Sequence, residues 1–416
     1  MTVSWLDLPA DTLFGLHNLP YGVFTTAAGG DRRRIGVAVG DRVLDAAAAA
    51  RATGFDHRLT ELLAAPSLNP LLAAGRADWT LVRAALTDWL TGPGYRAAVE
   101  PCLLPRAEAV LHLPFEVGDY VDFYASEHHA TNLGRLFRPG TDPLTPNWKH
   151  LPIGYHGRSG SVVVSGTPVV RPNGQRKAPA DAAPSFGPSR RLDIEAEVGF
   201  VVGVPAPVGT PVPLADFAEH VFGVCLVNDW SARDIQAWEY VPLGPFLGKS
   251  FATSVSPWVV PLDALAHART VPPARDVEPL PYLDDRDGAD PWALDLSLEV
   301  RLNGTPVSRP PFAGMYWTAA QQLAHMTVNG AGLRAGDLFA SGTVSGPDRG
   351  TEGALIELTW NGERPVKLAD GSVRSFLEDG DEVVITATAP GPDGSRIGFG
   401  EVAGRVLPGL DFTGDR

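Results

Sequence analysis

Apolar residues alternate with polar ones, or form short runs, along most of the chain, and this pattern predicts many short strands. Residues 19–44 hold strand-like runs with a turn at Gly40, and residues 45–54, 59–66 and 79–92 have the apolar spacing of helices. The last of these runs ends at Gly92 followed by Pro93, where a helix is expected to stop. Because residues 93–115 resemble a linker, we expect a small domain over 1–115 and a larger one over 116–416.

The larger region predicts strands more often than helices. Its strand-like runs are bounded by Gly, Pro, Asn or Asp and cover residues 161–172, 192–203, 294–307, 354–363 and 381–390. Helical patterns are fewer and cover residues 127–137, 214–220, 231–239 and 318–328. The pattern therefore predicts an α+β fold, mostly β, with a large mixed sheet.

Composition narrows the functional classes. The 416 residues carry a formal net charge of −14 without a basic tract, which argues against a nucleic-acid partner and against an anionic membrane surface. Two cysteines are too few for a disulfide framework, and no apolar run is long enough for a membrane span. The N-terminus lacks the pattern of a signal peptide, so we expect a cytoplasmic protein.

The segment 228–258 carries the strongest chemical signal. It places Asp229, Arg233, Gln236 and Lys249 among large aromatic side chains, where charges are costly to bury unless they are paired or bound to a metal. Asp229 directly follows an apolar run that is typical of a buried strand. Polar residues at the end of such a strand are a frequent location for a functional site.

Three separate motifs supply carboxylates. Glu195 and Glu197 lie two apart in a strand-like run, so their side chains should share one face. Together with Asp122 and Asp229 they suggest an oxygen-lined metal site. Since these motifs contain neither His nor Cys, Mg²⁺ or Ca²⁺ is favoured over zinc or copper.

Other residues offer catalytic or binding groups. His128 and His129 lie shortly after Asp122, and either could act as a general base; the pattern does not choose between them. Lys249 is one of only four lysines, against thirty arginines, and could either lie with its stem along an apolar edge or stabilise a developing negative charge. Arg138 could bind a carboxylate in bidentate fashion.

Several longer motifs resemble the fumarylacetoacetase family, also called the fumarylacetoacetate hydrolase family. In the first part these are HNLPYGVF and RRIGVAVGDRVLD, at residues 17–24 and 33–45. In the second part they include GDYVDFY, HHATNLG, LDIEAEVGF, the segment 228–258 and LFASGTVSGP. The resemblance covers nearly the whole chain.

The resemblance implies an N-terminal SH3-like barrel, a β-roll catalytic domain and a homodimer. It implies hydrolysis of the carbon–carbon bond of 4-fumarylacetoacetate, a dianionic diketo acid, to fumarate and acetoacetate in tyrosine and phenylalanine breakdown. The implied metal ligands are Asp122, Glu195, Glu197 and Asp229 for Mg²⁺ or Ca²⁺, with Lys249 and Thr253 at a second position. The implied catalytic groups are His129, Glu357, Arg233, Gln236 and Lys249, and the implied substrate contacts are Tyr124, Arg138, Tyr240 and Thr343.

Two other functions fit parts of the same pattern. A hydrolase of another β-diketone acid, such as an acylpyruvate, or a related decarboxylase or isomerase would also need a metal-stabilised enolate. A metal-containing protein without catalytic activity would not need His129 or Glu357.

Overall fold

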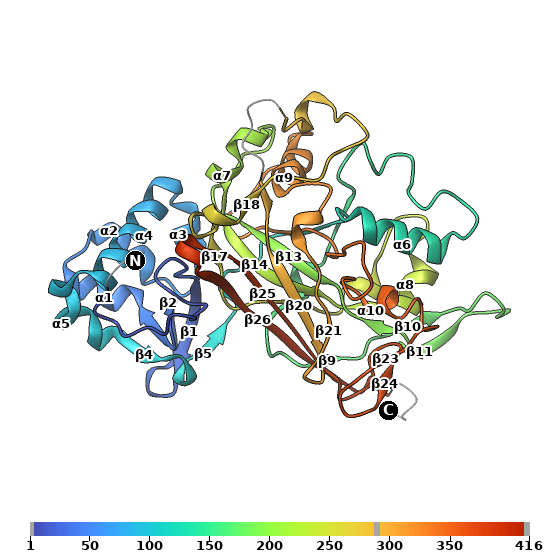
Figure 1. Ribbon diagram of the computed structural model, residues 1–416, viewed down its shortest axis with the longest axis horizontal. Coiled ribbons are helices and arrows are strands. Elements are labelled where there is room, and N and C mark those ends of the chain that lie inside the picture. The colour runs from blue at the N-terminus through green and yellow to red at the C-terminus, as the bar shows by residue number, and fades with distance from the viewer. Residues whose placement is uncertain (1–3, 287–291, 412–416) are drawn as a thin grey trace.

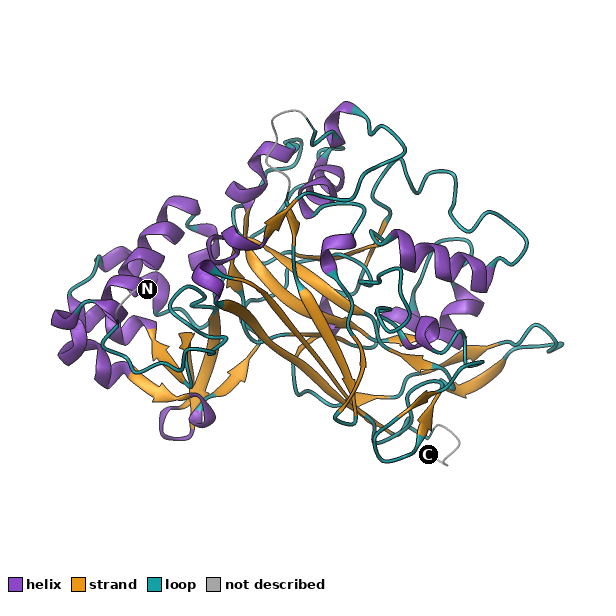
Figure 2. Cartoon of the chain, in the orientation of Figure 1, coloured by secondary structure: helices purple, strands orange, loops and turns teal. Residues whose placement is uncertain are grey.

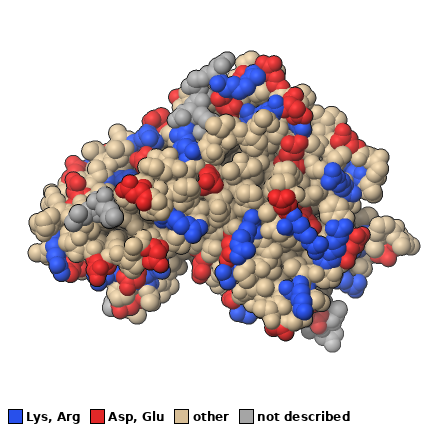
Figure 3. Space-filling view, viewed as in Figure 1, with Lys and Arg blue, Asp and Glu red and all other residues tan. Residues whose placement is uncertain are grey.

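The computed structural model describes residues 4–286 and 292–411 and contains helices and mixed sheets. Figure 1 shows the N-terminal region beside a larger body that is rich in strands, and Figure 2 shows helices around the strands of that body. None of the described helices combines the length and the hydropathy that a membrane span requires. On the face shown in Figure 3, basic and acidic side chains are interspersed.

The N-terminal region combines one sheet with a group of helices. The sheet has the strand order β4-β3-β2-β1-β5, with bounds β1 (Tyr21–Thr26), β2 (Gly30–Val39), β3 (Arg42–Asp45), β4 (Leu103–Pro105) and β5 (Val110–His112). The helices are α1 (Ala46–Thr53), α2 (His57–Leu63), α3 (Asn69–Ala73), α4 (Arg76–Thr91) and α5 (Arg96–Val99). The predicted helical runs are confirmed as α1, α2 and α4, and the Asp45 and Asp56 side chains cap the first two.

An eight-stranded mixed sheet forms the centre of the larger region. Its main path is β7-β6-β22-β13-β14-β16-β8, and β17 pairs with β14 off this path. The pairs β6–β22 and β8–β16 are parallel and the others are antiparallel. The bounds are β6 (Tyr120–Phe123), β7 (Gly154–His156), β8 (Val162–Val164), β13 (Ala196–Val202), β14 (Val221–Asp229), β16 (Thr253–Val255), β17 (Val260–Pro261) and β22 (Leu338–Ala340).

A second sheet packs near the first, and short ribbons surround both. Its order is β21-β20-β25-β26-β9, with bounds β9 (Val169–Val170), β20 (Ser297–Leu302), β21 (Thr305–Ser308), β25 (Glu382–Pro390) and β26 (Arg396–Leu407). The ribbons are β10 (Asn173–Arg176) with β11 (Ser185–Pro188), β12 (Leu192–Asp193) with β15 (Ser231–Ala232), β18 (Arg269–Thr270) with β19 (Ala293–Leu294), and β23 (Val366–Lys367) with β24 (Val373–Arg374). The remaining helices are α6 (Glu127–Phe137), α7 (Phe217–His220), α8 (Arg233–Glu239), α9 (Ala319–Thr327) and α10 (Leu355–Leu358).

Both faces of β14 in the central sheet are buried, which explains the nearly continuous apolar run of this strand. Val224 and Leu226 lie in the core that the larger region forms with its second sheet. Cys225 and Val227 lie in another core, which also contains apolar residues of the N-terminal sheet and helices. The N-terminal region therefore covers one face of the sheet.

One predicted strand is wrong. Residues 354–363 were expected to be extended, but they form the single helical turn α10 followed by a tight turn in which Trp360 and Asn361 have positive φ. A short apolar run fits a buried helix as well as a buried strand. The choice is made by Asp193, whose carboxylate accepts hydrogen bonds from the backbone N–H groups of Leu355 and Ile356.

Gly342 joins β22 to the cavity wall and cannot carry a side chain without a clash. Its φ is +77°, and a Cβ atom there would lie 2.2 Å from the Phe123 carbonyl oxygen on β6. The next residue, Thr343, lines the main cavity. Close approach of β6 to this segment therefore depends on glycine.

Gly342→Ala should destabilise the protein more than Gly350→Ala. Gly350 also has a positive φ, +84°, but a Cβ atom there meets nothing within 4 Å. Gly350→Ala should therefore lower the free energy of unfolding only by the cost of placing a side chain at positive φ, about 1–2 kcal/mol. Gly342→Ala should lose the same amount and, in addition, the cost of the clash with the Phe123 carbonyl oxygen. Denaturant unfolding of both variants measures the difference, and equal losses would show that the Phe123 contact relaxes without cost.

Candidate functional site

The register of the central sheet brings the predicted carboxylates to one face. Asp122 pairs with Ala340, and Glu197 pairs with Val227, two residues before Asp229. Because alternate residues of a strand share a face, side chains from three strands converge there. Glu195 lies one residue before β13 and joins them. The predicted shared face of Glu195 and Glu197 is thus confirmed.

The four carboxylates form one buried cluster. One oxygen atom from each of Asp122, Glu195, Glu197 and Asp229 lies within 4.8 Å of the others, and all four residues are buried. Asp122 Oδ1 and both carboxylate oxygens of Glu197 accept no hydrogen bond from the described residues. Buried carboxylate oxygens without donors fit a hard divalent cation, which binds oxygen ligands, so these residues could hold Mg²⁺ or Ca²⁺.

Two buried cations contact the same cluster. The Lys249 ammonium donates to Glu195 Oε2 and, at 2.7 Å, to Asp229 Oδ2. Arg233 contacts Glu195 Oε1 through NH1 at 2.8 Å. Burial alone would lower the pKa of Lys249, but the adjacent Asp229 and Glu195 carboxylates raise it, so Lys249 is charged. The hypothesis that its stem merely lies along an apolar edge is therefore wrong.

The same cations act in the opposite direction on Glu195. Burial raises its pKa, but Lys249 and Arg233 outweigh this effect and hold the pKa well below the usual range. Within the described part of the chain, no ion pair joins Glu197 or Asp122 to a cation. Burial and repulsion from neighbouring carboxylates raise the pKa of both well above that of an exposed carboxyl group.

Helix α6 positions His129 beside the cluster. The helix begins after Ser126, whose hydroxyl accepts from the His129 backbone N–H at 3.3 Å. His129 Nδ1 lies 2.6 Å from Glu357 Oε2, and its Nε2 lies 3.8 Å from Glu195 Oε1. His129 is buried and His128 is only half-buried, so His129 is the histidine that lies against these carboxylates. A histidine held at one nitrogen by a carboxylate, with the other facing a site, has the geometry of a general base.

Glu357 is itself held by polar groups that the sequence did not single out. Its Oε1 accepts from Asn132 Nδ2 at 3.0 Å, and its Oε2 accepts from Ser345 Oγ at 2.9 Å. Asn132 could have been found, because it lies three residues after His129 on the same helix and so shares its face. Ser345 lies 12 residues before Glu357, outside α10, so no helical spacing links the two residues.

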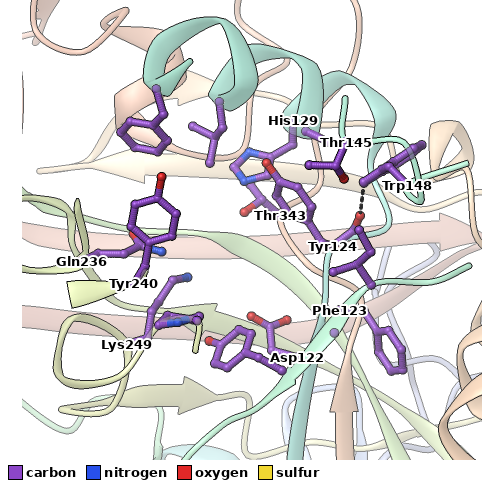
Figure 4. Close-up of a pocket in the computed structure, with 18 of the residues that line it drawn as sticks. Asp122, Phe123, Tyr124, His129, Thr145, Trp148, Gln236, Tyr240, Lys249 and Thr343 are labelled. Atoms are coloured by element: carbon purple, nitrogen blue, oxygen red, sulfur yellow. Dashed lines mark hydrogen bonds between the residues drawn. The ribbon is translucent and has the colours of Figure 1, made fainter. Parts of the chain in front are cut away.

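These groups open into a cavity of about 400 Å³, within the range of small-molecule sites. In Figure 4, His129 comes from the helix on one side and Asp122 from a strand on the other, with Thr343 between them. The cavity lining includes the predicted residues Asp122, Tyr124, His129, Arg138, Glu195, Gln236, Tyr240, Lys249 and Thr343. It also includes apolar and aromatic residues that were not predicted, among them Leu133, Phe137, Leu144, Trp148 and Ile153.

The predicted substrate contacts differ in what they offer. Thr343 Oγ1 is buried and has no hydrogen-bond partner among the described residues, so it is available to a ligand. The Tyr124 ring packs edge-on against His129 with 5.3 Å between the ring centroids. Arg138 donates to the Pro143 carbonyl at 2.8 Å, which holds its guanidinium at the cavity wall. Tyr240 is partly exposed.

The remaining predicted residues lie behind the cavity wall. Arg233 is buried and, among the described residues, is not part of the lining; it contacts Asp193, Glu195 and Gln236. Because Gln236 Oε1 accepts from Arg233 at 3.2 Å, the Gln236 amide nitrogen is the group that can face a ligand. Thr253 Oγ1 donates to Asp229 Oδ1 at 3.2 Å.

Comparisons with known proteins agree along the whole chain. Residues 17–114 match the fumarylacetoacetase N-terminal family, and residues 120–407 match the fumarylacetoacetate hydrolase C-terminal family. Fumarylacetoacetase of Bos taurus is 48% identical and covers 99% of this chain and 100% of its own length. The Homo sapiens protein is 48% identical (98% and 99% covered), and the Arabidopsis thaliana protein is 44% identical (97% and 98% covered).

Solved structures share the fold at much lower identity. Fumarylacetoacetate hydrolase from Exiguobacterium antarcticum has a TM-score of 0.54 at 17% identity, covering 94% of this chain and 99% of its own. Maleylpyruvate hydrolase from Sphingobium sp., in complex with manganese(II) ion and pyruvate, has a TM-score of 0.51 at 17% identity, covering 94% and 100%. With both domain families matched and relatives nearly half identical over their full length, the chain belongs to the fumarylacetoacetate hydrolase family.

Proposed function

We propose that this protein hydrolyses 4-fumarylacetoacetate to fumarate and acetoacetate. One observation carries the proposal: His129, paired with Glu357, faces the carboxylate cluster within a single cavity. This places a general base next to a site for a divalent cation, which is the combination that hydrolysis of a β-diketone needs. The full-length similarity to fumarylacetoacetases supports the choice of substrate.

The reaction divides into water activation and departure of an enolate. His129 Nε2 takes a proton from water, and Glu357 holds Nδ1–H so that Nε2 is the basic nitrogen. The water oxygen bonds to the carbonyl carbon of the fumaryl half, and the carbon–carbon bond to the acetoacetate half then breaks. The bonding electrons pass to the acetoacetate enolate, and a proton from His129 completes the product.

Charge stabilisation is the larger demand, because an enolate is a poor leaving group. A divalent cation bound by Asp122, Glu195, Glu197 and Asp229 would act as a Lewis acid on the keto oxygens. Lys249 and the Gln236 amide line the cavity and would add hydrogen-bond donors, each typically worth about 100- to 1000-fold in rate. Arg233 would act less directly, through its ion pair with Glu195.

Substrate binding would use the polar groups of the cavity wall. Arg138 would bind a terminal carboxylate, and Tyr124, Tyr240 and Thr343 would contact the rest of the dianion. The Lys249 ammonium has no lone pair, so a second metal position would have to use its carbonyl oxygen together with the Thr253 hydroxyl. Mg²⁺ and Ca²⁺ are the proposed metals because all four clustered ligands are carboxylates.

The family resemblance extends the proposal beyond the site. It supports a cytoplasmic homodimer that acts at the last step of tyrosine and phenylalanine breakdown. It also supports an SH3-like barrel for the N-terminal sheet and a domain boundary near residue 115. Light scattering after gel filtration tests the dimer.

The function is tested by the loss of fumarylacetoacetate absorbance, with acylpyruvates and oxaloacetate as competing substrates. We expect fumarylacetoacetate to have the highest kcat/KM, with fumarate and acetoacetate formed in equal amounts. Treatment with EDTA should abolish turnover, and added Mg²⁺ or Ca²⁺ should restore it. Faster cleavage of an acylpyruvate, or full activity in EDTA, would contradict the proposal.

His129→Ala should lower kcat by about 100- to 10,000-fold, the usual contribution of a general base. Its metal affinity, measured by calorimetry, should change little. The matched control is His128→Ala, which removes the adjacent, half-buried histidine of the same helix and should keep nearly normal kcat. Equal activities for the two variants would remove the assignment of the base.

Metal binding to the EDTA-treated protein should release protons and become tighter as pH rises. The pKa values of Asp122 and Glu197 are raised, so these groups keep protons that a cation must displace. Affinity should rise by up to about tenfold per pH unit for each displaced proton. Calorimetry in buffers of different ionisation enthalpy measures the release.

The control for this measurement is Asp285→Asn, which alters a buried carboxylate paired with Arg275 outside the cluster. It should leave proton release unchanged, whereas Glu197→Gln should reduce it.

The raised pKa values also predict that Asp122 and Glu197 stabilise the metal-free fold below their unfolded-state pKa, about 4. That contribution is lost as pH rises through the raised folded-state pKa values. Metal binding that releases no protons would contradict the raised pKa values of Asp122 and Glu197.

A further inference from the structure

Asp193 is a fully buried carboxylate that lies outside both the cavity lining and the metal cluster. Its Oδ1 accepts from the backbone N–H groups of Ile194 and Leu355, both at 2.7 Å. Its Oδ2 accepts from the Ile356 N–H at 3.1 Å and from Arg233 Nε at 2.8 Å. Both oxygens are therefore fully used, and their partners come from α8, from α10 and from Ile194, which directly follows β12.

One set of these hydrogen bonds determines where α10 begins. Ala354 occupies the N-cap position and has no side-chain oxygen, so the first free N–H groups of the helix need another acceptor. Asp193 supplies it from a different strand. Glu357 lies in this single turn, and its carboxylate holds His129 Nδ1. The position of the orienting carboxylate therefore follows from Asp193.

The hydrogen bond from Arg233 Nε to Asp193 Oδ2 fixes the plane of the Arg233 guanidinium. Asp193 holds the guanidinium at Nε, while Glu195 and Gln236 contact NH1 at 2.8 and 3.2 Å. Because a guanidinium is planar and rigid, contacts at two of its nitrogens set its orientation. The same carboxylate thus connects the charge-balancing arginine with the turn that carries Glu357.

We propose that Asp193 is a positioning residue for the hydrolytic reaction: it holds Glu357 in register with His129 and Arg233 against Glu195, without touching substrate. This inference rests on the proposed function. If Asp193 acts on turnover through Glu357, then replacing both residues should lower kcat by little more than replacing Glu357 alone. A residue that only stabilised the fold would have independent effects.

A double-mutant cycle tests the overlap with Asp193→Asn, Glu357→Gln and the double variant. The asparagine keeps the size of Asp193, but its Nδ2 faces N–H donors and cannot accept from them. We expect Asp193→Asn alone to lower kcat by about 30-fold or more with KM changed less than about threefold. In a protein that already carries Glu357→Gln, adding Asp193→Asn should lower kcat by less than about threefold.

Asp381→Asn is the matched control. Asp381 is also a buried carboxylate that accepts from an arginine (Arg374 Nε, 2.9 Å) and from a backbone N–H (Glu378, 2.8 Å), but it lies outside the cavity lining and the cluster. Its kcat should stay within about twofold of the parent even if its unfolding midpoint falls as much as that of Asp193→Asn. A comparable kcat loss in the control would overturn the proposal.

A second-site change provides rescue. Ala354→Ser introduces a hydroxyl at the N-cap of α10 and should recover at least about threefold of the lost kcat in Asp193→Asn. If Asp193→Asn alone does not fold, the double variant Asp193→Asn with Ala354→Ser takes its place. Failure of this double variant to give active enzyme would count against the proposal. The proposal is likewise overturned if the two losses multiply, or if folded Asp193→Asn keeps the parent kcat.

A crystal structure of Asp193→Asn gives a readout without substrate. We expect the 2.6 Å contact between His129 Nδ1 and Glu357 Oε2 to be lengthened or lost, and an unchanged contact would overturn the proposal. Because this measurement needs no turnover, it separates the two hypotheses. If the parent enzyme does not cleave fumarylacetoacetate, the proposed function fails, while the positional role of Asp193 is still decided.

Discussion

The structure depends on the burial of four carboxylates at one point of the central sheet. Among the described residues, Lys249 contacts Glu195 and Asp229, and Arg233 contacts Glu195, so these two buried cations do not balance four ionised carboxylates. Such a group is unfavourable in a protein interior unless a further positive charge is bound. A divalent ion would balance this excess, and the raised pKa values of Asp122 and Glu197 show the same imbalance in its absence.

The sequence was sufficient to predict the cluster and most of the strands around it. Carboxylates in otherwise apolar runs are costly, and Glu195 and Glu197 also have the two-residue spacing that shares a strand face. The choice between His128 and His129 needed either the family resemblance or the structure, since adjacent helical residues differ only in direction. The helix that carries them was predicted with its observed bounds.

Other parts of the site could not be predicted from local patterns. The turn α10 looks like a strand because Leu355 and Ile356 are apolar, and its helical start depends on Asp193, which is distant in sequence. Ser345 likewise meets Glu357 only after folding. Interactions of this kind are tertiary, and they override the weak preferences of a four-residue segment.

The apolar core that the N-terminal region shares with the carboxylate-bearing strands has a consequence for the chain as a whole. Cys225 and Val227 of β14 pack in the same core as Leu44 and Leu86 from the N-terminal region. A fragment beginning near residue 116 would therefore expose an apolar sheet surface on the face that carries the acidic residues, because Val227 and Asp229 are alternate residues of β14. Such a fragment should associate or aggregate, which makes the first hundred residues a structural support for the chemistry at the opposite end of those strands.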